Sequence, residues 1–160
     1  MAFQRSSPSA PISLTGRALR LLSGREHSRA ELERKLQPYE PEDAPGALAQ
    51  VLDSLQAKGF INEQRVVDSV LYRRAAKLGT ARIRQELHTK GLDPAMVQEA
   101  VARLQDTELA RAREVWRKKF GSPPEDAAAR GKQQRFLLAR GFSGDVVRKV
   151  VAGGDEQDWQ

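Results

Sequence analysis

The sequence contains no cysteine, only two histidines and no long run of hydrophobic residues. Without cysteine the chain cannot form a disulfide, a thiolate nucleophile or a cysteine-bearing zinc site. A membrane-spanning helix needs about 20 consecutive apolar residues, and no stretch approaches that length. Residues 1–14 also lack the apolar core of a signal peptide. We therefore expect a soluble, cytoplasmic protein with no membrane segment.

Sequence motifs that support catalysis are also missing. The nearest approach to a phosphate-binding loop, Gly131-Lys132, is followed by Gln133 where Ser or Thr is required. His27 and His88 lie far apart, and neither has the spacing that places two metal ligands on one helix face. We expect both histidines to be exposed at helix ends. We also expect no enzyme activity, no cofactor and no metal site.

Charge is the most informative part of the composition. The chain has 27 basic and 21 acidic side chains, a net charge of +6 and a pI near 10.0. Residues 65–149 hold 19 basic and 10 acidic side chains, so the excess is concentrated there. A surplus of this kind attracts a polyanion or an acidic protein surface.

Hydrophobic residues recur at spacings of three and four, without sustained alternation of period two, which predicts an all-α fold. Ser28 and Ser122, each followed three residues later by glutamate, and Asp93 before a proline mark helix starts. Gly79 and Gly141 follow helical stretches, where access to positive φ ends a helix. These signals predict nine helices, at residues 16–23, 29–37, 44–58, 63–77, 80–89, 94–105, 107–120, 123–139 and 143–152.

The predicted helices group in threes. Residues 87–92 match residues 137–142, and the same register pairs Val101 with Val151. A weaker copy of the pattern lies earlier in the chain. Tandem helix-turn-helix-like repeats, each too small for a full core, predict an elongated, curved molecule. We expect a flexible N-terminal arm at residues 1–14 and an acidic, disordered tail at residues 153–160. Between them we expect repeat 1 at residues 15–61, repeat 2 at residues 62–106 and repeat 3 at residues 107–152.

The basic surplus is expected on the outer faces of the second and third repeats. Ile83 and Leu87 lie one helical turn apart and are predicted to face inward, which leaves Arg82 outward and Arg84 on a flank. The alternative is an ordinary solvated face, with ion pairs four residues apart such as Arg82 to Glu86. Glu114 and Lys118 have the same spacing. Such pairs account for part of the charge but not for the surplus.

Aromatic residues divide between the core and one surface position. A core role is predicted for Trp116, Phe120, Phe136 and Phe142. Tyr72 is a candidate surface contact because Arg73 and Arg74 follow it directly. Charge alone proposes six contact residues: Arg73, Arg74, Lys77, Arg117, Lys118 and Lys119.

Four stretches of the sequence carry a more specific pattern. The first comprises residues 17–22, His27-Ser28 and residues 31–36, and the second runs from Gly59-Phe60-Ile61 to Arg65. The third comprises residues 81–87 and Lys90-Gly91, and the fourth is residues 134–142. Together they resemble the RecX family of bacterial recombination regulators, over nearly all of residues 16–151. The third stretch, Ala-Arg-Ile-Arg-Gln-Glu-Leu, is the most specific because it recurs in degenerate form at the period of the repeats.

The resemblance implies three tandem three-helix units and a non-enzymatic modulator of the RecA recombinase. Members of the family bind the RecA–DNA filament, limit its growth or promote its disassembly, and so reduce the ATPase, recombinase and co-protease activities of RecA. This would place the chain in homologous recombination, DNA repair and the SOS response. We expect a monomer whose partners are the RecA filament and, weakly and non-specifically, single- or double-stranded DNA. The candidate contacts that match the family stretches are Arg82, Arg84, Lys90, Arg135 and Arg140.

The chain departs from the family pattern in two places. Residues 77–80 read Lys-Leu-Gly-Thr where basic-Gly-aromatic-Gly-Pro is usual, and Val66 and Val70 stand where Phe or Tyr is frequent. The alternative function is a helix-turn-helix transcriptional regulator, since a three-helix unit with a basic helix can enter the major groove of DNA. A protein of that kind would distinguish one duplex site from random DNA at fixed salt.

Overall fold

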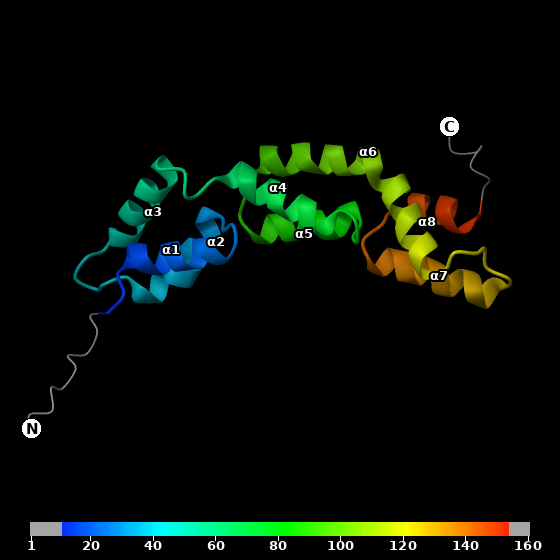
Figure 1. Ribbon diagram of the computed structural model, residues 1–160, viewed down its shortest axis with the longest axis horizontal. Helices are drawn as coiled ribbons and strands as arrows, with labels where there is room; N and C mark the ends of the chain where they lie inside the picture. The colour runs from blue at the N-terminus through cyan, green and yellow to red at the C-terminus, as the bar shows by residue number, and fades with distance from the viewer. Residues whose placement is uncertain (1–10, 154–160) are drawn as a thin grey trace, which may run out of the picture. The chain divides into compact units, whose positions relative to one another are not determined.

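The structure, a computed structural model, describes residues 11–153 as helices joined by short turns (Figure 1). The described residues contain no strand, which confirms the all-α prediction. Contacts divide the chain into two compact units that meet in sequence at Asn62 and Glu63. The arm predicted at the N-terminus falls mostly outside the described residues, and so does the acidic tail after Gly153. The predicted curvature stays a prediction.

The first unit contains the first repeat. Its elements are α1 (Leu14–Gly24), α2 (Arg29–Leu36), the short 3-10 helix η1 (Gln37–Tyr39) and α3 (Ala47–Ala57). Ser28 accepts the backbone N–H of Glu31, and the Glu31 carboxylate accepts the backbone N–H of Ser28, so the predicted capping box is confirmed. Ala18, Leu32 and Leu52 are fully buried at the centre of this repeat.

The second unit contains the other two repeats, each with its own hydrophobic core. Its helices are α4 (Glu63–Arg74), α5 (Thr80–Thr89), α6 (Pro94–Lys119), α7 (Ala127–Ala139) and α8 (Gly144–Val151). Ile83 and Leu87 of α5 are buried in the first of these cores, as predicted. Leu137 and Phe142 are buried in the second. The three cores found in residues 11–153 confirm three tandem three-helix repeats.

One long helix replaces two that the sequence analysis predicted. The helices expected at residues 94–105 and 107–120 are the single helix α6, so that prediction was wrong. The boundary expected between the second and third repeats falls inside it. No Gly or Pro interrupts the segment, and its buried positions continue at helical spacing from Leu104 through Glu108 to Ala112. Helix α6 therefore contributes side chains to both cores of the second unit.

The start of α7 also differs from the prediction. Ser122 does not cap this helix, which begins at Ala127. Asp126 is the N-cap instead, and its carboxylate accepts the backbone N–H of Ala129 at 2.7 Å. Asp accepts this bond as readily as Ser does, so a capping pattern in sequence does not decide between two neighbouring candidates.

Gly79 and Gly141 hold the second and third repeats together. The backbone N–H of Gly79 donates to the carbonyl of Arg140 at 2.8 Å, and that of Ala81 donates to the carbonyl of Gly141 at 3.3 Å. Gly141 has φ of 90°, as its predicted helix-ending role requires. Gly79 has φ of −77°, so its predicted need for positive φ was wrong. A Cβ at Gly79 would lie 2.2 Å from the backbone of Gly141.

Two charged side chains of α6 form hydrogen bonds to the backbone of the turn between α4 and α5. The buried carboxylate of Glu108 accepts the backbone N–H of Thr80 at 3.1 Å. Arg111 donates to the carbonyls of Ala75 and Leu78, at 2.9 and 2.6 Å. Burial lowers the pKa of the Arg111 guanidinium. Because these bonds satisfy the free backbone groups between α4 and α5, the turn at residues 75–80 is fixed against α6.

Candidate interaction surface

Most of the predicted contact residues lie on the surface of the second unit. The exposed ones are Arg73, Arg74, Lys77, Arg82, Arg84, Arg117, Lys118, Lys119 and Arg135. Arg140 is half-buried. Lys90 is only 8% exposed, so it does not lie on the open surface that the sequence analysis assigned to it.

The two arginines of the α5 sequence stretch lie in different depressions. Arg82 and Arg84 flank the buried Ile83, and each step along a helix turns the side-chain direction by about 100°. Arg82 lines a hollow of about 310 Å³ between α4 and α5, together with Arg74. Arg84 lines a groove of about 550 Å³ between α5 and α6. A partner that contacts one of these arginines therefore approaches a different flank of α5 from one that contacts the other.

The groove between α5 and α6, the α5–α6 groove, is lined by one arginine together with apolar and polar side chains. Its lining residues are Arg84, His88, Pro94, Val97, Gln98, Val101, Ala102 and Gln105. Arg84 is exposed and makes no ion pair with any residue in the range 11–153. Arginine beside apolar side chains is typical of protein contact surfaces, where it binds carboxylates while its stem packs on hydrocarbon.

The cations of the α4–α5 hollow already have partners within the protein. The guanidinium of Arg74 lies 3.3 Å from the Glu86 carboxylate. The predicted pair of Arg82 with Glu86 is absent from the described structure, because the Arg82 guanidinium donates to the carbonyl of Ala139 at 2.9 Å. Arg82 therefore joins the second repeat to the third, and its replacement would disturb the fold as well as the surface.

The cations at the end of α6 are also partly neutralised. Glu114 lies 2.7 Å from Arg117 and 3.8 Å from Lys118, so the predicted pair with Lys118 is confirmed. The hydrogen bond from Arg117 lowers the pKa of the Glu114 carboxyl. These pairs are exposed, and exposed pairs of this kind stabilise a helix only slightly.

Two further candidates cover an aromatic cluster. The guanidinium of Arg140 lies 4.4 Å from the centre of the Phe136 ring, and the ammonium of Lys119 lies 5.5 Å from it. Phe142 is buried in the core of the same repeat, as predicted, and Trp116 and Phe136 are half-buried against it. Phe120 is also half-buried and meets Phe136 edge to face. Arg140 therefore has a packing role that its charge did not reveal.

The cations at the end of α4 form a separate exposed patch. Tyr72 is 91% exposed, as expected for a surface contact. Arg73 and Lys77 are exposed beside it and make no ion pair within the described range. Arg135 on α7 is likewise without a carboxylate partner there. Together with Arg84, these are among the predicted contacts whose charge is available to a partner.

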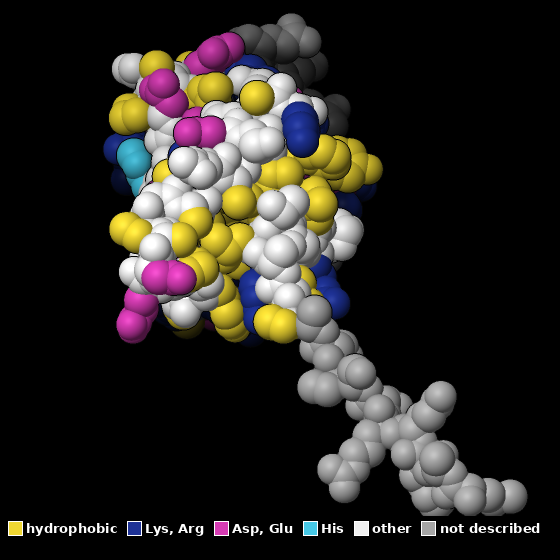
Figure 2. Space-filling model, turned by 90° about the vertical axis from the view of Figure 1, so that its left-hand side faces the viewer, with side chains coloured by type: hydrophobic (Ala, Val, Ile, Leu, Met, Phe, Trp, Pro, Cys, Tyr) yellow, Lys and Arg dark blue, Asp and Glu magenta, His cyan; other side chains and the backbone are white. Residues whose placement is uncertain are grey.

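The first unit contains cations that the sequence analysis did not select. Residues 11–62 hold as many acidic as basic side chains, so their net charge gave no signal. In the face of the molecule shown in Figure 2, the Asp and Glu side chains lie mainly on the left, and the Lys and Arg side chains lie mainly at the right and lower margins. Three of the cations, Arg17, Arg20 and Lys35, line one hollow.

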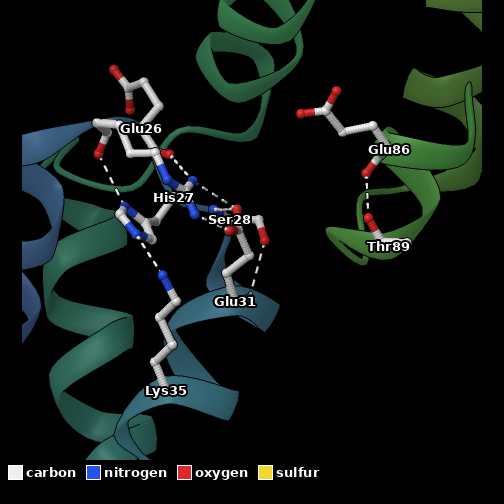
Figure 3. Close-up of polar contacts among 8 residues, drawn as sticks. Glu26, His27, Ser28, Glu31, Lys35, Glu86 and Thr89 are labelled. Carbon is white, nitrogen blue, oxygen red and sulfur yellow. Dashed lines mark hydrogen bonds and ion pairs between the residues drawn. The ribbon is translucent and has the colours of Figure 1, made fainter. Parts of the chain in front are cut away.

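His27 differs from the exposed histidine that was predicted, because its side chain is buried and only 2% exposed. Its Nδ1 lies 3.0 Å from the carbonyl of Arg25 and its Nε2 lies 3.3 Å from Nζ of Lys35 (Figure 3). Nδ1–H therefore donates to the carbonyl, and Nε2 accepts from the lysine. This arrangement requires a neutral ring. The other histidine, His88, is exposed as predicted.

The stability of the first unit should depend on the protonation of His27. Burial, with the charges of Arg25 and Lys35, lowers the pKa of His27 below 6.5. Below the ordinary histidine pKa, the unfolded chain therefore binds more protons than the folded chain. The contribution of His27 to the free energy of unfolding is fully present above that pKa and is lost as the pH falls through the pKa of the folded state. Urea unfolding at about pH 5 and about pH 7.5 should show this loss in the wild type.

Two substitutions identify the group responsible. His27→Gln should show less stability loss on acidification than the wild type, because the titrating ring is gone. His88→Gln should behave like the wild type, because that side chain is exposed. An identical pH dependence in all three proteins would assign the effect to other groups.

The described residues contain neither a helix with the length and hydropathy of a membrane span nor a cluster of side chains that could hold a metal ion. Comparison with protein families gives a positive result over most of the chain. Profiles described as the first, second and third three-helix domains of RecX match residues 16–44, 62–101 and 106–151. The chain belongs to the RecX family.

Individual RecX proteins match over almost the full chain. A protein of Leptothrix cholodnii named "Regulatory protein RecX" is 53% identical over 146 residues, which cover 91% of this chain and 92% of that protein. A protein of the same name from Ralstonia pickettii is 46% identical and covers 93% of this chain and 92% of its own. These relatives support a regulatory role for the chain.

Solved RecX structures share the fold. A structure described as regulatory protein RecX has a TM-score of 0.68 at 20% identity, covering 88% of this chain and 72% of that one. RecX from Lactobacillus salivarius has a TM-score of 0.67 at 21% identity, covering 92% of this chain and 96% of its own. At this identity the likeness concerns the helical architecture alone.

Proposed function

We propose that this RecX-family chain binds the RecA–DNA filament and inhibits RecA, by blocking filament extension or by promoting disassembly. The observation that carries the proposal is Arg84, an exposed arginine that lines the α5–α6 groove and makes no ion pair with residues 11–153. It lies in the most specific of the sequence stretches that resemble RecX. We assign the chain to the cytoplasm, where the filament forms, and expect it to act as a monomer without enzyme activity of its own.

The α5–α6 groove suits a protein segment that carries a carboxylate beside apolar side chains. Val97 and Val101 supply the hydrocarbon and Arg84 supplies the charge. An arginine loses less hydration on contact than a lysine, and its planar guanidinium binds a carboxylate through two parallel bonds. We therefore assign this groove to a RecA subunit rather than to DNA.

The patch at the end of α4 suits the nucleic acid of the same filament. Arg73 and Lys77 provide charge for phosphates, and Tyr72 provides an exposed ring for contact with a base or a sugar. Contacts of this kind are independent of sequence and weaken with salt. We expect such contacts to give weak, non-specific binding of single- or double-stranded DNA.

Helix α5 does not offer its first turn as the recognition helix of a helix-turn-helix transcriptional regulator would. In such proteins the N-terminal residues of the recognition helix contact the base edges. The first turn of α5 lies instead against the turn that follows α7, with Gly79 bonded to Arg140 and Ala81 bonded to Gly141. This end of α5 is therefore covered by the third repeat.

The proposed function predicts a direct effect on RecA catalysis. Addition of the protein to RecA on single-stranded DNA should lower the steady-state ATPase rate progressively, because fewer subunits remain in filaments. The rate is measured against protein concentration, with an equal amount of an inert basic protein as the control. An ATPase rate that stays unchanged at excess protein would refute inhibition of the filament.

A further inference from the structure

A small basic hollow lies on the first unit, and none of the contact residues predicted from the sequence lines it. It has a volume of about 210 Å³ and is formed by α1, α2 and η1. Its lining residues are Arg17, Arg20, Leu21, Lys35, Leu36 and Tyr39. Three of the six carry a positive charge and none carries a negative charge. Cations gathered in one hollow repel one another unless an anion lies between them.

The carboxylates of the first unit do not neutralise this hollow. Glu31 forms its ion pair with Arg25 at 2.6 Å, and Glu33 forms one with Arg29 at 3.1 Å. Glu40 accepts backbone N–H groups at the start of α3. The three cations of the hollow have no carboxylate partner between residues 11 and 153. The hollow therefore has charge available for an external anion.

Buried groups hold Lys35 in place at this hollow. Its ammonium donates to Nε2 of His27, whose other nitrogen donates to the carbonyl of Arg25 (Figure 3). A neutral histidine accepts a hydrogen bond from the ammonium and leaves its positive charge in place. A carboxylate at the same position would neutralise that charge. His27 is therefore a positioning residue for Lys35.

An aromatic ring stands at the rim of the hollow. The guanidinium of Arg17 lies 3.8 Å from the centre of the Tyr39 ring, which fixes the ring beside the charges. Tyr39 is still 51% exposed, so part of it is open to a ligand. Cations next to an exposed aromatic ring are typical of sites that bind single-stranded nucleic acid, in which phosphates and bases alternate.

The size of the hollow limits what it can hold. Sites for small molecules usually have volumes of about 300–1,000 Å³. At about 210 Å³ this hollow is smaller, and it suits one anionic group better than a whole nucleotide. We infer that it binds a phosphodiester of a single-stranded nucleic acid, with a base of the same strand against Tyr39. This inference concerns the first unit alone and does not rest on the proposed action on RecA.

Photo-crosslinking tests the contact directly, with full-length protein and no RecA. An oligothymidylate that carries 5-bromodeoxyuridine is irradiated with the protein, and the cross-linked peptides are identified by mass spectrometry. We expect a cross-link at Tyr39 in the wild type. Arg20→Gln and Lys35→Gln should each reduce its yield several-fold, because each removes one phosphate contact.

Lys58→Gln is the matched control, because it removes one exposed charge from the same unit outside the hollow. Its cross-link at Tyr39 should equal that of the wild type. Circular dichroism establishes that all the variants are folded. Equal cross-linking in Lys58→Gln and in the two hollow variants, or no cross-link at Tyr39 in the wild type, would overturn the inference.

Competition separates a strand from a free phosphate compound. Inorganic phosphate or ATP, added at the same phosphate concentration as the oligonucleotide, should leave the Tyr39 cross-link unchanged. Its loss under those conditions would assign the hollow to a free phosphate compound and contradict binding of a strand.

Discussion

Replacing Gly79 with alanine should destabilise the second unit by about 2–4 kcal/mol. The added Cβ would lie 2.2 Å from the carbonyl carbon of Gly141 and from the backbone nitrogen of Phe142. Both neighbours are backbone atoms, so no side-chain rotation relieves the overlap. The turn after α7 must move away from α5, and the bonds from Gly79 and Ala81 then lengthen or break.

Urea unfolding followed by circular dichroism measures this effect. Gly144→Ala is the control in the same unit, because a Cβ there meets only the flexible end of Arg148 at 3.4 Å. It should be neutral or slightly stabilising, by about 0.5–1 kcal/mol, since alanine favours the helix. Equal stability of the Gly79→Ala and Gly144→Ala proteins would show that the two repeats do not meet closely at this point.

Reversal of the charge at Arg84 should have the largest effect on function. We expect Arg84→Glu to raise the protein concentration needed for half-inhibition of the RecA ATPase about tenfold, a loss of about 1.4 kcal/mol. The new carboxylate would repel the acidic group that the α5–α6 groove is proposed to bind. The fold should be unaffected, because Arg84 is exposed and makes no ion pair between residues 11 and 153.

Lys149→Glu provides the matched control for Arg84→Glu. It makes the same change of charge at an exposed position on α8, outside the groove. It should inhibit RecA almost as well as the wild type. Equal losses in both variants would show that total charge, and not the groove, determines the interaction.

Salt dependence should distinguish the proposed contact with RecA from the proposed contact with DNA. Variants of Arg73 or Lys77 should bind free DNA less tightly and with a smaller salt dependence, because each phosphate contact contributes to that dependence. Arg84→Glu should leave the binding of free DNA almost unchanged. A parallel loss of DNA binding and RecA inhibition in Arg84→Glu would assign the groove to phosphates instead.

The sequence predicted the helices well where local signals agree. Ser28 with Glu31 and Asp93 with Pro94 cap helices as expected, because capping depends on residues close together in the chain. The break expected near Asp106 does not exist, because a polar residue is tolerated within a helix when no Gly or Pro stops it. Buried side chains on both sides of this position then keep the helix continuous.

The candidate site was harder to predict, because charge in a sequence does not show whether it is already used. Arg82 and Arg84 are arginines of the same sequence stretch. In the structure, Arg82 donates to the carbonyl of Ala139, whereas Arg84 has no ion pair among the described residues. The carbonyl lies 57 residues away, beyond the reach of any local pattern. Lys90 is basic but buried, and its position in the sequence gives no sign of this burial.

The first unit shows why net charge can hide a local cluster of cations. Acidic and basic residues are equal in number over residues 11–62, so net charge does not single out this segment. Folding brings Arg17 and Arg20 of α1 beside Lys35 of α2, while Glu31 and Glu33 are held by other arginines. Only the positions of these partners in space separate the charges into a basic hollow.

Filament length tests the central claim most directly. RecA filaments on single-stranded DNA are imaged by electron microscopy after incubation with increasing amounts of the protein. Binding that blocks extension or promotes disassembly predicts a progressive fall in mean length, with Arg84→Glu requiring about tenfold more protein for the same effect. Filaments of unchanged length at excess wild-type protein would contradict the account.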